Sequence, residues 1–176
     1  MTDDNKKISI IGTNTRYQIK KVSQNKEIKT RIKSEKWTDE IMTNQYKIIE
    51  DLKNNVDLTK DHELFINEIN TKITGYKQQD VKKNLLDVNN FVSLDQVINK
   101  IYDSNLTCFY CTRSLLVLYT IVREKMQWTL DRIDNDKGHT NDNVIICCLE
   151  CNLQRKRKSK DSFTFTKQFV LVRNEY

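Results

Sequence analysis

The sequence predicts an α+β protein, in which a mainly helical N-terminal region precedes a small unit of two strands and a helix. Three observations lead to this fold class. Apolar residues recur at three- and four-residue spacings between Ser34 and Ile101, as they do in helices that bury one face. Short apolar runs, typical of strands, follow Cys111. Two C-x2-C pairs flank these runs.

The first third of the chain begins with a polar segment and continues as a helix. Residues 1–33 are polar, apart from three isoleucines before Gly12 that could form a short strand. From Ser34, a candidate N-cap, the apolar spacing predicts a helix. The Asn54 and Asn55 pair is a stop signal, because asparagine favours turns.

Two further helices are expected before the first cysteine. Apolar residues at helical spacing predict a helix over 64–73 that ends at Gly75, since glycine commonly follows a helix C-terminus. The polar segment 76–90 is compatible with helix or loop. Ser93 and Gln96 have the spacing of a capping box, which predicts the start of a helix that leads to the first cysteine pair.

After Cys111 the pattern changes to strands. The apolar runs 115–119 and 144–147 and the alternating segment 128–133 predict strands. A helix should follow from 150 to about 158. We expect the aromatic tail after it to pack back onto the core.

The chain therefore divides into three parts. Residues 1–105 form a mostly helical region without a readable motif, 106–160 form the cysteine-flanked ββα unit, and 161–176 form the tail. The longest apolar run has six residues, 144–149, whereas a membrane-spanning helix needs about 20. The first seven residues lack the apolar segment of a secretory signal. We therefore expect an intracellular, reducing compartment.

The positive charge is concentrated near the C-terminus. The net charge of +6 arises from 30 Lys and Arg against 24 Asp and Glu, and residues 152–176 contribute 7 basic and 2 acidic side chains to it. A dense basic run suggests contact with a polyanion. The alternative is a solvated helix end. The run consists of Arg155, Lys156, Arg157 and Lys158.

The cysteine pairs predict a structural zinc site. In a reducing compartment, cysteines at this spacing are better explained as metal ligands than as disulfides. Two C-x2-C pairs supply four thiolates, which suit tetrahedral Zn²⁺. Thirty-six residues lie between the pairs and leave room for a hairpin. The expected ligands are Cys108, Cys111, Cys148 and Cys151, with Cys147 as a core thiol. The alternative is a set of buried free thiols.

A second metal site is predicted where the first strand meets the last helix. Asp131 ends the strand, and Asn152 begins the helix directly after the last cysteine. The zinc site would fix Asn152 in space, and the ββα fold can bring it opposite Asp131. A carboxylate and an amide oxygen, with waters and a phosphate oxygen, make a Mg²⁺ site. Zinc would then be structural and magnesium catalytic.

The motifs together resemble an HNH endonuclease with a ββα-metal site. Residues 106–160 carry the match, and the stretch 158–173 is similar to stand-alone HNH proteins of large DNA viruses. The matching residues are Cys108-x2-Cys111, Leu130-Asp131-Arg132-Ile133-Asp134, Gly138-His139, Asn143 and Cys148-x2-Cys151-Asn152.

The resemblance implies Mg²⁺-dependent hydrolysis of DNA phosphodiester bonds, with Mn²⁺ as a substitute, in the cytoplasm or nucleus of a host cell if the source is viral. It assigns Asp131 and Asn152 as metal ligands, Asn143 as the residue that braces the loop, and Arg155 as a phosphate-binding base. One such site cuts one strand, so a double-strand break would need a homodimer or two events.

One position departs from the family pattern. The residue after the strand-ending aspartate is usually the histidine that activates water, but here it is Arg132, which resembles a minority Asp-Arg variant. A guanidinium cannot accept a proton near pH 7. His139 offers an imidazole in the same loop, and the alternative is a solvated surface histidine.

Two other interpretations remain open at the level of sequence. The chain could be a non-catalytic zinc module that binds nucleic acid, with a site degenerated at Arg132. It could also be a structural zinc protein with an unrelated partner, against which the basic run argues. The pairing of Asp131 with Asn152 favours the nuclease, because a binding module would need neither.

Overall fold

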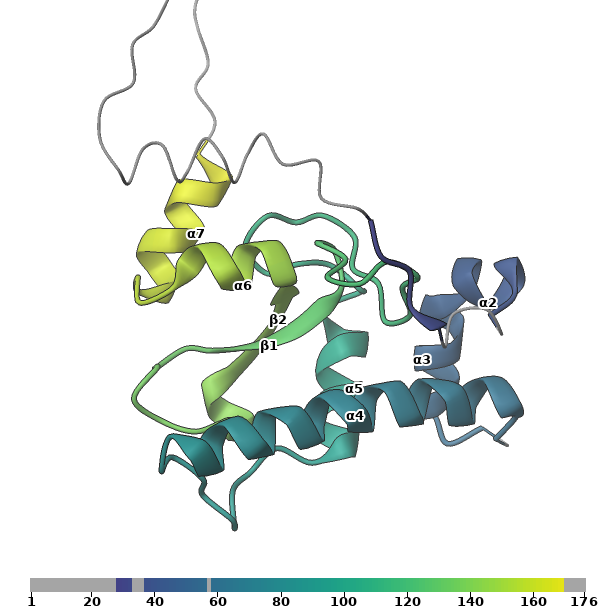
Figure 1. Ribbon diagram of the computed structural model, residues 1–176, viewed down its shortest axis with the longest axis horizontal. Coiled ribbons are helices and arrows are strands. Elements are labelled where there is room, and N and C mark those ends of the chain that lie inside the picture. Colours follow the sequence, from purple (N-terminus) through teal and green to yellow (C-terminus); the bar gives the residue numbers. More distant parts are fainter. Residues whose placement is uncertain (1–27, 33–36, 57, 170–176) are drawn as a thin grey trace, which may run out of the picture.

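The computed structural model describes residues 28–32, 37–56 and 58–169 (Figure 1), and it is a mixed α and β fold. Within these residues, six α-helices accompany one two-stranded sheet. The candidate strand before Gly12, the candidate N-cap Ser34 and the end of the tail lie outside them. The elements are α2 (Asp39–Thr43), α3 (Gln45–Lys53), α4 (Lys60–Lys82), α5 (Leu94–Asp103), β1 (Trp128–Arg132), β2 (Val144–Cys148), α6 (Leu149–Arg155) and α7 (Lys160–Gln168).

The helix expected from Ser34 to the asparagine pair is divided in two. Asn44 is both the C-cap of α2 and the N-cap of α3. The expected stop is confirmed, since α3 ends at Lys53 and Asn55 takes a left-handed φ of 54°. Asparagine tolerates this conformation better than most residues. Helices α3, α4 and α5 share a core, in which Ile49, Phe65, Ile69 and Ile101 are fully buried.

Helix α4 does not end at Gly75, and the expectation that it would was wrong. The helix continues for seven more residues, to Lys82. A glycine in a helix interior costs only about 1 kcal/mol relative to alanine. The extension is anchored by contacts with the ββα unit, because Tyr76 accepts a hydrogen bond from the backbone N–H of Leu130 and Asp80 pairs with His139. Figure 1 shows α4 running beneath the sheet.

The capping box that starts α5 is confirmed. The hydroxyl of Ser93 accepts from the backbone N–H of Gln96 at 3.3 Å, and the Gln96 side chain accepts from the backbone N–H of Ser93 at 3.0 Å. Both contacts satisfy N–H groups that have no partner within the helix. The helix then buries Val97, Ile98 and Ile101 and leads the chain to the first cysteine pair.

The sheet has the expected hairpin order but one strand fewer than expected. β1 pairs antiparallel with β2, from Trp128 opposite Cys148 to Arg132 opposite Val144, and α6 follows β2 directly. The apolar run 115–119 is not a strand. Leu116 forms only an isolated parallel bridge with Gln127. The buried side chain of Gln45 accepts from the backbone N–H groups of Val117 and Leu118, so these two groups are paired with a side chain rather than with a strand.

The C-terminal part packs on the core through one aromatic residue. Helix α6 ends at Arg155, earlier than expected, because Lys156 adopts a left-handed φ of 54°. Phe163 of α7 is buried against Tyr110, with ring centroids 4.9 Å apart. Phe165 and Phe169 remain exposed. Among the described residues, every helix is too short or too polar to cross a membrane.

Gly138 marks a close contact between the hairpin loop and the chain after α4. A Cβ atom at Gly138 would lie 2.3 Å from the carbonyl oxygen of Leu85, a backbone atom that cannot swing away. We expect Gly138→Ala to lower the free energy of unfolding by about 1–3 kcal/mol, the usual cost of overpacking. Chemical denaturation measures this loss.

Gly75→Ala is the matched control for this experiment. Nothing lies within 4 Å of a Cβ at Gly75, which sits inside α4. We expect this variant to gain about 0.5–1 kcal/mol, because alanine loses less backbone entropy in a helix than glycine does. Equal stability of the two variants would contradict the assigned contact at Gly138.

Candidate functional site

Four cysteines from the two C-x2-C pairs meet in one cluster that could hold a metal such as zinc. The Sγ atoms of Cys108, Cys111, Cys148 and Cys151 all lie within 4.8 Å of one another, and three of the four residues are buried. Backbone N–H groups point at the sulfurs, from Cys148 to Cys108 Sγ and from Cys151 to Cys148 Sγ, each at 3.3 Å. Four thiols in this arrangement suit tetrahedral coordination.

Cys147 lies outside the cluster. Its Sγ is 3.4 Å from the hydroxyl of Thr129, the residue opposite Cys147 on strand β1. Burial raises the pKa of the Cys147 thiol well above its ordinary value. A neutral, buried thiol of this kind is a core residue, as the sequence predicts.

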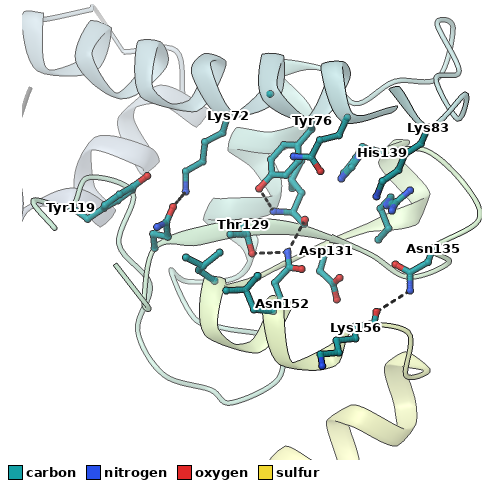
Figure 2. A pocket seen from close by; sticks show the side chains of 17 residues that line it. Lys72, Tyr76, Lys83, Tyr119, Thr129, Asp131, Asn135, His139, Asn152 and Lys156 are labelled. Carbon is teal, nitrogen blue, oxygen red and sulfur yellow. Dashed lines mark hydrogen bonds between the residues drawn. The ribbon is translucent and has the colours of Figure 1, made fainter. Parts of the chain in front are cut away.

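Polar side chains line a pocket of about 660 Å³ between α4, β1 and α6 (Figure 2). Three residues expected to form the site, Asp131, Asn152 and His139, line this pocket together with Arg132. Their meeting depends on α4, because one wall of the pocket consists of its residues, among them Lys72 and Tyr76.

The free edge of β1 forms the floor of the pocket. In a two-stranded sheet, alternate backbone groups of each strand point away from the partner strand and need other partners. The Lys72 ammonium donates to the carbonyl of Trp128, and Tyr76 accepts from the N–H of Leu130. The amide of Asn152 donates to the carbonyl of Leu130 at 3.1 Å. The N–H of Trp128 donates to the backbone carbonyl of Leu116, and from there on side chains of α4 and α6 take the place of a third strand.

Asn152 is fixed by its amide nitrogen. Besides the carbonyl of Leu130, this nitrogen donates to the hydroxyl of Thr129 at 3.1 Å. The residue belongs to the first turn of α6, whose N-cap is the cluster cysteine Cys148. With both donor contacts directed at β1, the amide oxygen is the atom that Asn152 can offer to a ligand in the pocket.

Asp131 is buried and paired with a cation of the chain itself. Nε of Arg155 lies 2.6 Å from Oδ2 of Asp131 as an ion-pair contact without hydrogen-bond geometry, while a terminal nitrogen of Arg155 donates to Oδ1 at 3.1 Å. The Tyr110 hydroxyl also donates to Oδ2, at 2.6 Å. Burial, and then this carboxylate, raise the pKa of Tyr110. The carboxylate is therefore held rigidly and its charge is balanced.

Arg155 was expected to bind DNA phosphate as part of the basic run, but it lies inside the protein. It is 1% exposed, and its side chain also donates to the carbonyls of Arg132 and Lys158. A guanidinium has five N–H donors and can serve several acceptors at once. The rest of the basic run, Lys156, Arg157 and Lys158, is exposed, and Lys156 lines the pocket.

The loop between the strands is braced by Asn143, the residue that the resemblance assigns to this role. Its amide nitrogen donates to the carbonyls of Asp134 and Gly138, at 3.0 and 2.9 Å, and its amide oxygen accepts from the N–H of Asp134 at 2.9 Å. Arg132 adds a further contact, to the carbonyl of Lys137 at 2.8 Å. These bonds fix the loop that carries His139.

His139 is a buried histidine rather than a surface one. It is 4% exposed, and its Nδ1 lies 2.7 Å from Oδ1 of Asp80 in α4. Burial is the main cause that lowers the pKa of His139 below its ordinary value, with Asp80 acting in the opposite direction. The imidazole is therefore neutral near pH 7 and can accept a proton.

Positive charge surrounds the pocket. Arg132, Lys83 and Lys156 line it, and so does Lys72, whose ammonium lies 4.8 Å from the ring centroid of Trp128. Burial first, and then the Arg31 guanidinium, lower the pKa of Lys72 to about 7. The exposed lysines, Lys83 and Lys156, are suited to contact phosphate groups.

Comparisons with family models, curated proteins and solved structures found no match for this chain.

Sequence reasoning missed the residues that α4 contributes. Lys72, Tyr76 and Asp80 are spaced four apart and therefore share one face of a helix. This spacing indicates a shared helix face only if the helix is predicted to continue beyond Gly75. Tyr110, between the first two cluster cysteines, was missed because nothing in the sequence shows which strand its hydroxyl reaches.

The cysteine cluster makes a direct prediction. Cys148→Ser should lose the bound metal and destabilise the ββα unit, because a tetrahedral site with one thiolate removed binds zinc weakly, while serine can still serve as the N-cap of α6. Metal analysis of the purified wild type should give about one zinc per chain. Cys147→Ser is the control and should retain the metal. Full zinc occupancy in Cys148→Ser would contradict the ligand assignment.

Proposed function

We propose that this chain is a metal-dependent endonuclease of the HNH type that hydrolyses DNA phosphodiester bonds. The observation that carries the proposal is the meeting of Asp131, Asn152 and His139 in one pocket at the free edge of β1. An acidic ligand, an amide oxygen and a neutral imidazole are the groups that metal-assisted hydrolysis requires. The ββα order and the adjacent cysteine cluster support the same proposal.

Magnesium is the catalytic metal that this donor set suits. Asp131 and Asn152 offer oxygens, the ligands that hard cations prefer. Arg155 balances the charge of Asp131, so phosphate oxygens of the substrate would have to complete the site, as is usual for Mg²⁺. A bound Mg²⁺ would stabilise the negative charge that develops on the scissile phosphate. We expect Mn²⁺ to substitute, since it accepts the same ligands.

The chain's own residues divide the remaining work. His139 takes one proton from a water molecule, whose oxygen forms a bond to phosphorus while the bond from phosphorus to the 3′ oxygen breaks. The leaving oxygen takes a proton from solvent. Arg132 binds a phosphate oxygen through its guanidinium and stabilises the charge on it. Lys83 and Lys156 position the backbone of the DNA.

We propose zinc for the cysteine cluster, in a structural role. All four ligand positions are supplied by thiolates, which leaves no open position for a substrate. The last two ligands, Cys148 and Cys151, lie at the N-terminal end of α6, and Cys151 directly precedes Asn152. The zinc would thereby hold Asn152 at the edge of β1.

One observation favours a second candidate, a non-catalytic zinc module that binds nucleic acid. The carboxylate of Asp131 is already paired with Arg155 and hydrogen-bonded by Tyr110, so Asp131 could serve the fold alone. The two candidates differ in one measurement, because only the nuclease cleaves DNA in the presence of a divalent metal.

The metal ligands are tested by nicking of supercoiled plasmid in Mg²⁺, Mn²⁺ or EDTA. We expect cleavage in either metal and none in EDTA. Asp131→Asn and Asn152→Ala should abolish it while DNA binding and zinc content persist. Asp131→Asn is preferable to alanine, because its amide oxygen can still accept a hydrogen bond from the buried Arg155, although either change removes the charge that balances this guanidinium.

Asp142→Asn is the control for lost negative charge in the same hairpin, since Asp142 is exposed and does not line the pocket. It should cleave like the wild type. Cleavage by Asp131→Asn at the wild-type rate would refute this site. Binding without any cleavage by the wild type would favour the second candidate.

The basic residues at the pocket make a separate prediction. Lys83→Gln combined with Lys156→Gln should weaken binding to unrelated DNA sequences alike, because phosphate contacts carry no direct sequence information. The slope of log affinity against log salt should fall by about 2, roughly 0.9 for each lost contact with a duplex. Lys77→Gln, an exposed residue of α4 outside the pocket, is the control. An unchanged slope in the double variant would show that these lysines are only solvated.

A further inference from the structure

His139 is held by a residue that lies outside the ββα unit. Asp80 belongs to the last turn of α4, 59 positions earlier in the chain, and is fully buried. Its Oδ1 lies 2.7 Å from Nδ1 of His139, and its Oδ2 accepts from the backbone N–H of His139 at 2.6 Å. One carboxyl group therefore fixes both the ring and the backbone of this histidine.

Asp80 can approach the hairpin loop this closely because Gly138 has no side chain. A Cβ at Gly138 would lie 3.0 Å from Oδ2 of Asp80 as well as against the carbonyl of Leu85. The backbone carbonyl of His139 in turn accepts from the N–H of Val92. The loop is thus attached to the helical region on both sides of the imidazole, and Asp80 is the charged member of this attachment.

The contact decides which ring nitrogen carries the proton. A carboxylate only accepts hydrogen bonds, so Nδ1 of His139 must be the donor and Nε2 must hold the lone pair. Nε2 makes no hydrogen bond within the described part of the chain, and His139 lines the pocket shared with Asp131 and Asn152. The nitrogen that can accept a proton is therefore the one left to the pocket.

We propose that Asp80 is the positioning residue of His139, which it holds with the lone pair of Nε2 available to the water that attacks the phosphate. This role rests on the proposed nuclease function. It gives the helical region a part in the site, because the ββα unit alone lacks the partner of its base. When Nε2 takes the proton, the carboxylate of Asp80 balances the charge on the imidazolium.

The electrostatic surroundings of His139 define the expected pH effect. Asp80 and Tyr76 face the ring from α4, Lys83 from the turn after it and Arg132 from β1. Burial and the two cations lower the pKa of His139, whereas Asp80 raises it. Loss of the Asp80 charge should therefore lower this pKa further, so that the imidazole becomes a weaker base.

The test is a histidine-labelled ¹⁵N NMR titration of the full-length protein. The chain has two histidines, and the second is an internal control. Nδ1 of His62 accepts from the backbone N–H of Thr59 at 3.0 Å, so His62 must be protonated on Nε2. We expect opposite tautomers in one spectrum, with His139 protonated on Nδ1.

Asp80→Asn preserves the shape of the side chain and removes its charge. In this variant the titration of His139 should move to lower pH while that of His62 stays unchanged. A wild-type His139 protonated on Nε2, or an unchanged His139 titration in the variant, would overturn the proposal. Neither result depends on nuclease activity.

Nicking rates separate positioning from a merely structural role. Asp80→Asn should slow cleavage by roughly 10–100-fold, the usual loss for a residue that orients a functional group, and should shift the rate–pH midpoint downward. In a His139→Ala background it should have no further effect, since two residues that act through one group are not additive. Further slowing there would show that Asp80 acts only through stability. If the wild type nicks no DNA, the proposed function fails, whereas the NMR result still decides the tautomer.

Discussion

The unpaired edge of β1 is the constraint on which the site depends. A two-stranded sheet exposes outward backbone groups on each strand, and buried groups of this kind need partners. The N–H of Trp128 donates to the backbone carbonyl of Leu116, and the other partners are side chains, Lys72 and Tyr76 from α4 and Asn152 from α6. Each of these three side chains also lines the pocket. The same side chains therefore pair the backbone groups at the edge of β1 and line the pocket. A third strand at this position would remove the pocket.

Two attachments hold the ββα unit from opposite sides. The cysteine cluster joins the segment after α5 to the N-terminus of α6, through Cys108 and Cys148. The pair of Asp80 and His139 joins α4 to the hairpin loop. The first attachment sets the position of Asn152 and the second that of the imidazole. The ββα unit excised from the helical region would keep the former and lose the latter, so residues 106–160 alone lack the residue that holds His139.

The sequence predicted the local features and missed the distant ones. The cysteine spacing, the Ser93 capping box and the two strands follow from rules that act within a few residues. The continuation of α4 through Gly75 does not, because contacts with β1 outweigh a small local preference. The burial of Arg155 could not be predicted from the sequence either. Nothing in a basic run indicates that one of its residues forms an ion pair with a carboxylate 24 positions earlier.

The buried ionisable groups at this pocket occur in pairs, and the pairing has a consequence for stability. Asp131 is paired with Arg155, and Asp80 with His139. Removing one member of a buried pair is strongly destabilising, whereas apolar replacement of both is often neutral. The fold could therefore dispense with both pairs at little cost in stability. That a chain with a modest core buries four ionisable groups around one pocket is more readily explained by chemistry than by stability. In the proposed function, Arg155 balances the charge of Asp131 in the free protein, and Asp80 balances the charge of His139 once the imidazole takes a proton.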